Sequence, residues 1–381
     1  MFKKILFSFL TWRVALFLIA FLSIYFLPVF GARFPYTDRV LEITHLPYWV
    51  WGFGNFDGVH YLRIAQDGYF AQYSQAFFPL FPILIRLFSF IFPRVANLDL
   101  NIFTDPAYFY SGIILSNLFF LGALLVLYKL IKIDFDKDIS FLSIALLLML
   151  PTSFFFGSIY TESLFLLLVV SSIYLIRKSH FFWAAVVIAL STLTRITGVM
   201  LIPLYLIEAF KAKKKINYLW TMITPLGLIA YMYYLKITFN NPLYFLTSQP
   251  VFGAGRVSNG LVLLPQVIYR YFKIFITTKV LSLPFFNAFL EFSFTLIPLG
   301  ILIAIFKKVR LSYWVFSLST LLLGTLTGTF SSMPRYALVS MVLLLPYLVV
   351  KFRKHFTLLS LISVLLGIIL ITLFIRGYWV A

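Results

Sequence analysis

Apolar runs of about 20 residues recur in this chain from its first line to its last, and each is long enough to cross a bilayer as a helix. Hydrophobic residues make up 62% of the 381 residues, and charged residues make up 11%. Soluble globular proteins carry about 25% charged residues, so this chain lacks the polar surface to face water on every side. The runs are continuous and do not alternate with polar residues, which excludes a transmembrane β-barrel. The sequence therefore predicts an all-α polytopic membrane protein, with residues 1–381 forming one transmembrane domain.

Basic residues gather between the apolar runs and give the predicted topology. The formal net charge is +19, and clusters such as Arg177-Lys178 mark cytoplasmic loops by the positive-inside rule. The N-terminus then lies in the cytoplasm, and the segments 31–105 and 237–284 lie outside. The first apolar run lacks a small-residue cleavage pattern, so we expect an uncleaved span and not a signal peptide. We expect about nine spans of helix, at residues 10–30, 107–130, 139–156, 160–176, 216–235, 285–306, 311–330, 336–350 and 356–375.

The segment 181–210 does not fit a single straight span. Basic clusters lie at both of its ends, and Arg195 lies in its middle beside Gly198. One straight helix would place a basic cluster on the wrong side and a charge in mid-bilayer. Two half-length helices that enter and leave from the cytoplasm avoid both problems, because broken backbone is tolerated where protein buries it. We therefore favour a re-entrant hairpin over one crossing.

Two further segments are typical of helices at the membrane interface. Residues 77–92 are apolar but short and bounded by prolines, which favours a half-inserted or interfacial helix. In the second outer segment, polar side chains recur at helical spacing on one face, as in helices that lie in the interface plane. These side chains are Gln266, Arg270, Lys273 and Thr277.

Charged residues in the first outer segment are candidates for chemistry. Asp57 stands where it would cap a helix that ends at Gly68, and His60 follows one turn later. A surface helix with an N-cap aspartate is the structural alternative to a catalytic role.

Five blocks of sequence resemble the PIG-V-type GPI mannosyltransferase family and its prokaryotic relatives. The first block combines Phe56-Asp57, His60-Tyr61-Leu62 and Gly68-Tyr69 at fixed distances. The other four follow in the family's order at residues 76–82, 158–165, 194–198 and 332–336. The chain departs from the family at Phe56, where tryptophan is usual, and at Gly58-Val59. Both differences concern the identity of the acceptor more than the chemistry of the transfer.

The resemblance implies a GT-C glycosyltransferase, a multi-span enzyme with its active site at the outer face. Its donor would be a sugar on a polyprenyl phosphate, with mannose the first candidate, and its acceptor a glycolipid or glycan. It would lie in a prokaryotic cell membrane, or in the endoplasmic reticulum membrane of a eukaryote, in contact with membrane lipids. Nucleic acid is not an expected partner, because the sequence shows no basic-aromatic binding motif.

The chemistry of such a transfer needs few protein groups. A glycosidase uses two carboxylates because its leaving alkoxide must be protonated. A phosphate is a far better leaving group, so one base that deprotonates the acceptor hydroxyl is sufficient. Arginine suits the phosphate, because its planar fork matches phosphate oxygens. We expect an inverting transfer with Asp57 and His60 as catalytic residues, and with substrate-binding residues Glu162, Arg195, Arg335, Tyr61 and Tyr160.

Each supporting residue has a structural alternative. Glu162 could be the partner of an arginine, Arg195 could tie the hairpin tip, and Arg335 could anchor a lipid headgroup. His60 could be a helix-cap partner, and Tyr61 could serve in packing. No metal or other cofactor is expected, because no second carboxylate follows two residues after Asp57.

Two other classes of function compete with the enzyme. A transporter or a flippase of lipid-linked glycans would distribute charges along several spans. A non-catalytic scaffold would not need this combination of aspartate, histidine and Phe77-Phe78-Pro79.

Overall fold

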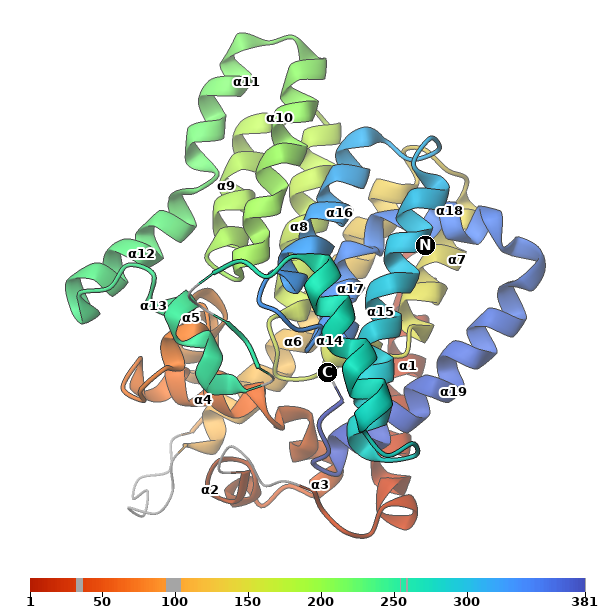
Figure 1. Cartoon of the computed structure of the whole chain (residues 1–381). Helices are drawn as coiled ribbons and strands as arrows, with labels where there is room; N and C mark the ends of the chain where they lie inside the picture. The colour runs from red at the N-terminus through yellow and green to blue at the C-terminus, as the bar shows by residue number, and fades with distance from the viewer. Residues whose placement is uncertain (32–36, 94–103, 254, 258–259, 381) are drawn as a thin grey trace.

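The computed structural model describes residues 1–31, 37–93, 104–253, 255–257 and 260–380, and these residues form helices and turns with no strand (Figure 1). Both predicted outer segments therefore lie partly outside the described residues, at 32–36 and 94–103 in the first and at 254 and 258–259 in the second. The all-helical prediction is confirmed.

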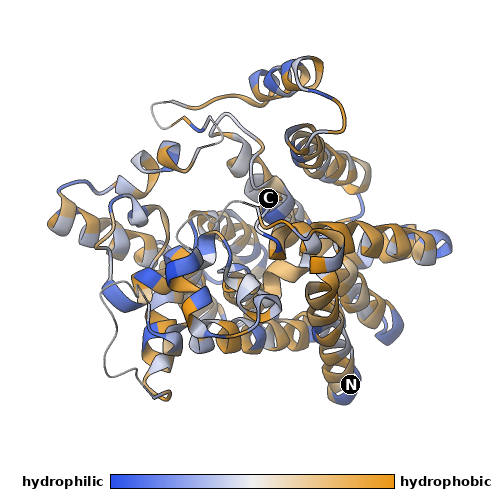
Figure 2. Cartoon of the chain, turned by 90° about the horizontal axis from the view of Figure 1, so that it is seen from below, coloured by the Kyte–Doolittle hydropathy of each residue, from blue (hydrophilic) through white to orange (hydrophobic). Residues whose placement is uncertain are grey.

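Five helical segments are long and apolar enough to cross a membrane. They are α1 (Phe2–Phe26), α6 (Pro106–Ile131), the continuous pair α11 (Lys215–Trp220) and α12 (Leu226–Phe239), α15 (Leu283–Ile305) and α19 (Phe356–Ile375). A sixth would be the pair α17 (Met333–Ser340) and α18 (Leu345–Lys351), whose two parts are bent by 47°. Viewed from below, the helix that begins at the N-terminus is hydrophobic along most of its length (Figure 2).

The predicted number of nine spans is not confirmed. Three of the predicted spans are shorter helices, α7 (Lys137–Met149), α8 (Glu162–Arg177) and α16 (Leu311–Thr325). Helix α7 ends before Pro151, since proline has no amide hydrogen and its ring clashes with the preceding turn. The chain continues as a buried 3-10 turn, Ser153–Gly157, so the predicted single helix 139–156 is wrong.

The predicted break within 181–210 is confirmed. Helices α9 (Phe181–Thr192) and α10 (Leu201–Ala212) form an antiparallel pair (Figure 1). The Tyr205 hydroxyl donates to the carbonyl of Phe181 at 3.4 Å, while Gly198 packs on Ser191 at the other end of α9. A Cβ on Gly198 would lie 2.6 Å from the Ser191 carbonyl carbon, so glycine is required for this close approach. Arg195 lies at the tip of the hairpin, between α9 and the turn that leads into α10.

Short helices cover one end of the long ones. They are α2 (Thr37–Val40), α3 (Tyr48–Trp51), α4 (Asp57–Asp67), α5 (Leu80–Ser89), α13 (Tyr244–Thr247) and α14 (Leu264–Thr277). Helix α14 packs along α15 with Val267 and Tyr271 buried, while its predicted polar side chains are exposed. This amphipathic helix has the form that the sequence predicts, and its place at a membrane interface stays a prediction.

The orientation of the helices can be tested by labelling single cysteines, because the native chain contains none. Gln72, Lys137 and Lys214 are all exposed. Cysteine at position 72 should react with an impermeant thiol reagent added outside intact cells, and cysteine at 137 or 214 should react only after the membrane is opened. Outside labelling at 214 would contradict the predicted cytoplasmic side of the open end of the α9–α10 hairpin.

Candidate functional site

Four charged side chains from four distant segments form a continuous chain of ion pairs. Arg335 Nη1 lies 2.6 Å from Asp57 Oδ2, and Arg335 Nε lies 2.9 Å from Glu162 Oε1, the latter without hydrogen-bond alignment. Arg195 Nη1 lies 2.5 Å from the same Glu162 oxygen. These are the four charged residues that the sequence predicts for the substrate and catalytic sites, apart from His60. The structure therefore brings together α4, α8, the hairpin tip and α17.

The backbone conformation at the start of α4 positions Asp57, and the Asp57 side chain does not cap this helix. Helix α4 begins at Asp57 and ends before Gly68, whose φ is 71°. Its N-cap residue is Phe56, with φ 60°, a conformation that costs on the order of 1–3 kcal/mol for a bulky residue. The Phe56 ring packs between Phe374 and Trp379, which offsets that strain. The predicted N-cap hydrogen bond is absent in this described segment, because the carboxylate of Asp57 faces Arg335 instead.

The electrostatics of Asp57 are set by burial and by Arg335. Burial alone would raise the pKa of the Asp57 carboxyl, but the adjacent guanidinium outweighs it and holds the pKa below its usual value. Asp57 is therefore ionised at neutral pH and is a weak base as long as Arg335 is paired with it.

Glu162 joins the two arginines through one oxygen only. Its side chain is 1% exposed, and both Arg195 and Arg335 approach Oε1. Its second oxygen, Oε2, is buried without a hydrogen-bond partner among the described residues. Burying such an atom without a partner is costly.

Tyrosine rings support both guanidinium groups. Arg335 lies 5.2 Å above the ring of Tyr160, and Arg195 lies 5.1 Å above the ring of Tyr336. Cation–π contacts of this kind stabilise a desolvated cation by about 2 kcal/mol or more. The Tyr160 hydroxyl donates to the carbonyl of Asn55 at 2.8 Å, which fixes the ring. The structure thus gives Tyr160 a supporting contact beneath Arg335.

Tyr61 and His60 lie on α4 near the charged chain. The Tyr61 hydroxyl is 3.5 Å from that of Thr161, and its ring packs edge-on against Phe77. The His60 ring stacks on Phe77 at 4.6 Å. Burial lowers the pKa of His60 to about 4 despite the opposing charge of Asp57, so this imidazole is neutral at pH 7.

Arg256 is a functional candidate that the sequence analysis missed. It comes from the second predicted outer segment, and its Nη2 donates to Ser332 Oγ at 3.2 Å. Its charge also contributes to the lowered pKa of Asp57. No local pattern marks it, since it lies in a turn outside any helix of the described structure.

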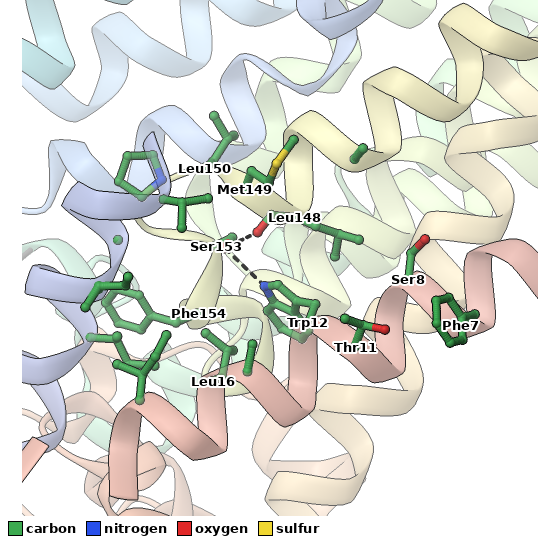
Figure 3. Close-up of a pocket in the computed structure, with 18 residues that line it drawn as sticks. Phe7, Ser8, Thr11, Trp12, Leu16, Leu148, Met149, Leu150, Ser153 and Phe154 are labelled. Carbon is green, nitrogen blue, oxygen red and sulfur yellow. Dashed lines mark hydrogen bonds between the residues drawn. The ribbon is translucent and has the colours of Figure 1, made fainter. Parts of the chain in front are cut away.

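An apolar cavity lies apart from the charged site. Its volume is about 350 Å³, and α1, α7, α19 and the turn after α7 line it (Figure 3). Trp12 Nε1 donates to Ser153 Oγ at 3.3 Å across one wall. None of the predicted site residues lines this cavity, so it is not the candidate catalytic site.

The comparison with protein families confirms the resemblance found in the sequence. Residues 43–221 match the model of the family described as Mannosyltransferase (PIG-V). This range includes Asp57, Glu162 and Arg195, while Arg335 lies beyond it.

Curated relatives match part of the chain. GPI mannosyltransferase 2 of Cryptococcus neoformans var. neoformans is 33% identical over 146 residues, which are 38% of this chain and 33% of that protein. GPI mannosyltransferase 2 of Drosophila pseudoobscura pseudoobscura is 27% identical over 141 residues, which are 36% of this chain and 29% of that protein. The matched part spans about a third of the length of these relatives.

Solved structures with a similar backbone arrangement include the oligosaccharyltransferase of Archaeoglobus fulgidus. Its apo form has a TM-score of 0.49 at 13% identity and covers 98% of this chain and 56% of that one. Its complex with zinc and sulfate has a TM-score of 0.47 at 14% identity and covers 95% of this chain and 53% of that one.

Removing Arg335 should destabilise the fold, because Asp57 would lose its partner while Glu162 would keep Arg195. We expect Arg335→Gln to lower the free energy of unfolding by on the order of 3–5 kcal/mol, as for other broken buried pairs. The control is Lys211→Gln, which removes an exposed cation from Glu208 while Arg310 stays paired with that carboxylate. It should cost at most about 1 kcal/mol. Denaturant titration in detergent compares the two, and equal losses would contradict the buried pairing.

Proposed function

Starting from the relationship of residues 43–221 to the PIG-V mannosyltransferases, we propose that this chain is an inverting glycosyltransferase. It transfers a sugar, with mannose as the first candidate, from a polyprenyl-phosphate donor to a hydroxyl of a glycolipid or glycan on the extracytoplasmic side. The observation that carries the proposal is the contact between Asp57 and Arg335 inside a largely buried group of two acids and two arginines. This arrangement supplies a base and phosphate-binding cations within one site.

The proposed reaction uses Asp57 as general base. The acceptor oxygen attacks the anomeric carbon of the donor sugar from the face opposite the phosphate, and its proton passes to the Asp57 carboxylate. The bond between the anomeric carbon and the phosphate oxygen breaks, and the lipid phosphate leaves with the electron pair. Arginine stabilises the negative charge that develops on that phosphate.

The ion pair with Arg335 makes this base dependent on the donor. In the free protein, Arg335 lowers the pKa of Asp57 and so weakens it as a base. A donor phosphate would compete for the same guanidinium. When Arg335 turns toward the phosphate, the pKa of Asp57 rises and the carboxylate becomes able to accept a proton. Binding of the donor therefore raises the basicity of Asp57, which then deprotonates the acceptor.

A transporter or flippase is the competing function. The arrangement of charges favours the enzyme, because the four buried charges form one compact group and do not follow a path along several helices. The test is transfer of radiolabelled mannose from a polyprenyl phosphate to a membrane glycolipid fraction by the purified protein. Movement of intact donor across liposome membranes without any transfer would support the flippase instead.

The role of Asp57 predicts a specific loss on amide substitution. In Asp57→Asn, Arg335 keeps Glu162 as a partner and the amide oxygen can still accept its hydrogen bond, so the protein should fold. The amide cannot take the acceptor proton, so transfer should fall by roughly 10²–10⁴-fold. Asp57→Glu should lose on the order of 10²-fold, because the carboxylate moves by about an ångström.

The matched control is Asp67→Asn, the same change at the exposed end of the same helix, where Asp67 pairs with Arg63. It should leave transfer near the wild-type rate. Purified Asp57→Asn protein that transfers sugar as fast as this control would remove the general-base role from Asp57.

The pH dependence of transfer should differ between the free and the donor-bound protein. The folded pKa of Asp57 lies below its usual value near 4, and that of His60 is about 4, so neither group titrates between pH 5 and 8 in the free protein. We expect kcat/KM for the donor to be flat over that range and to fall only at lower pH. The acid limb of kcat should lie at higher pH, because the donor relieves Asp57 of Arg335. If steady-state kinetics place the acid limbs of kcat and of kcat/KM at the same pH, Arg335 does not exchange Asp57 for the donor phosphate.

A further inference from the structure

Within the described residues, the charged group has a neighbouring cation that lacks a carboxylate partner. Arg335 and Arg195 are both committed to ion pairs with Asp57 and Glu162, so these four groups balance two positive charges with two negative ones. A phosphate that enters such a neutral group must first displace a carboxylate. Attraction of an anion to this site therefore needs an additional positive charge.

Arg256 supplies that charge. Its Nη2 donates to a neutral hydroxyl, that of Ser332, and it forms no ion pair within the ranges that the structure describes. It interacts electrostatically with Asp57 of the charged group and with Glu291 and Tyr336 nearby. The Glu291 carboxylate accepts the hydrogen bond of the Tyr271 hydroxyl and forms no ion pair with Arg256 among the described residues.

The backbone fixes Arg256 beside the residues that precede Arg335. Val257 N donates to Thr327 O at 2.9 Å, and Val262 N donates to Leu326 O at 3.1 Å. Ser332, which accepts from Arg256 through its hydroxyl, also accepts from the backbone amide of Arg335 through its carbonyl at 3.1 Å. The guanidinium of Arg256 is thus held at the turn from which α17 carries Arg335.

Exposure distinguishes Arg256 from Arg335. The side chain of Arg335 is buried, at 8% exposed, while Arg256, like Arg195, is partly exposed. A phosphate that approaches from outside the protein can therefore reach Arg256, which is not held in an ion pair by any described residue, before it reaches Arg335.

We propose that Arg256 is the first binding residue for the phosphate of the lipid donor and that it delivers this phosphate to Arg335. The proposal rests on the proposed function and adds to it a residue from the second outer segment. Because the lipid phosphate gains negative charge when the sugar leaves, Arg256 also stabilises the departing phosphate.

Direct binding of farnesyl phosphate tests the assignment without any sugar transfer. Three variants are compared with the wild type: Arg256→Gln, Arg256→Lys and the control Lys273→Gln, which removes an exposed cation from α14. Arg256→Gln should raise the Kd of farnesyl phosphate by roughly 10- to 100-fold, as expected for the loss of a charge-assisted hydrogen bond. Arg256→Lys keeps the charge and should lose less, and Lys273→Gln should bind as the wild type does.

Farnesol, which lacks the phosphate, separates charge recognition from lipid binding. Its affinity should be equal in all four proteins and should also show that each variant is folded. Wild-type affinity of Arg256→Gln for farnesyl phosphate would overturn the proposal, as would equal affinity of the wild type for farnesol and farnesyl phosphate.

The transfer assay separates this proposal from the proposed function. A wild-type protein that transfers sugar, together with an Arg256→Gln variant of unchanged donor KM, would overturn the role of Arg256 alone. A raised donor KM in Arg256→Gln, with KM unchanged in Lys273→Gln, would support it. A wild-type protein that transfers no sugar would overturn the proposed function, and farnesyl phosphate binding would still decide whether Arg256 recognises a lipid phosphate.

Discussion

The ion pair between Asp57 and Arg335 is the interaction on which the site depends. It joins side chains that are 278 residues apart, one at the start of α4 and the other in the first turn of α17. A buried carboxylate is stable only with a compensating charge, so each side chain requires the other to be in place. The pair thereby fixes helix α4 against the C-terminal part of the chain.

The remaining buried charges extend this pairing into a group that can respond to an anion. Glu162 connects Arg335 to Arg195, and the α9–α10 hairpin places Arg195 because its tip is broken where a straight helix would continue. The guanidinium of Arg335 faces two carboxylates at once. In the proposed mechanism, the donor phosphate is a third anion that competes for the Arg335 guanidinium. Asp57 then loses its partner, and its basicity rises.

The sequence predicts which residues form this site but not how they pair. A charged side chain within a mostly apolar chain is costly to bury and is usually functional. The sequence therefore singles out Asp57, Glu162, Arg195 and Arg335. Their pairing depends on how distant helices pack, which no local pattern contains. The N-cap interpretation of Asp57 was wrong for this reason, since Phe56 occupies the N-cap position and the Asp57 carboxylate pairs with Arg335. The predicted span 139–156 is too long, because α7 ends before Pro151. Arg256 lies in a turn that has no periodicity to mark it.

An experimental structure of the protein with a mannosyl polyprenyl phosphate bound would test the central claim most directly. The account predicts that the phosphate lies within hydrogen-bond distance of the Arg335 guanidinium, that the contact between Arg335 and Asp57 is lengthened or broken, and that the Asp57 carboxylate faces the anomeric carbon of the sugar. A donor bound with the Asp57–Arg335 ion pair intact at 2.6 Å, and with its phosphate away from both residues, would contradict it.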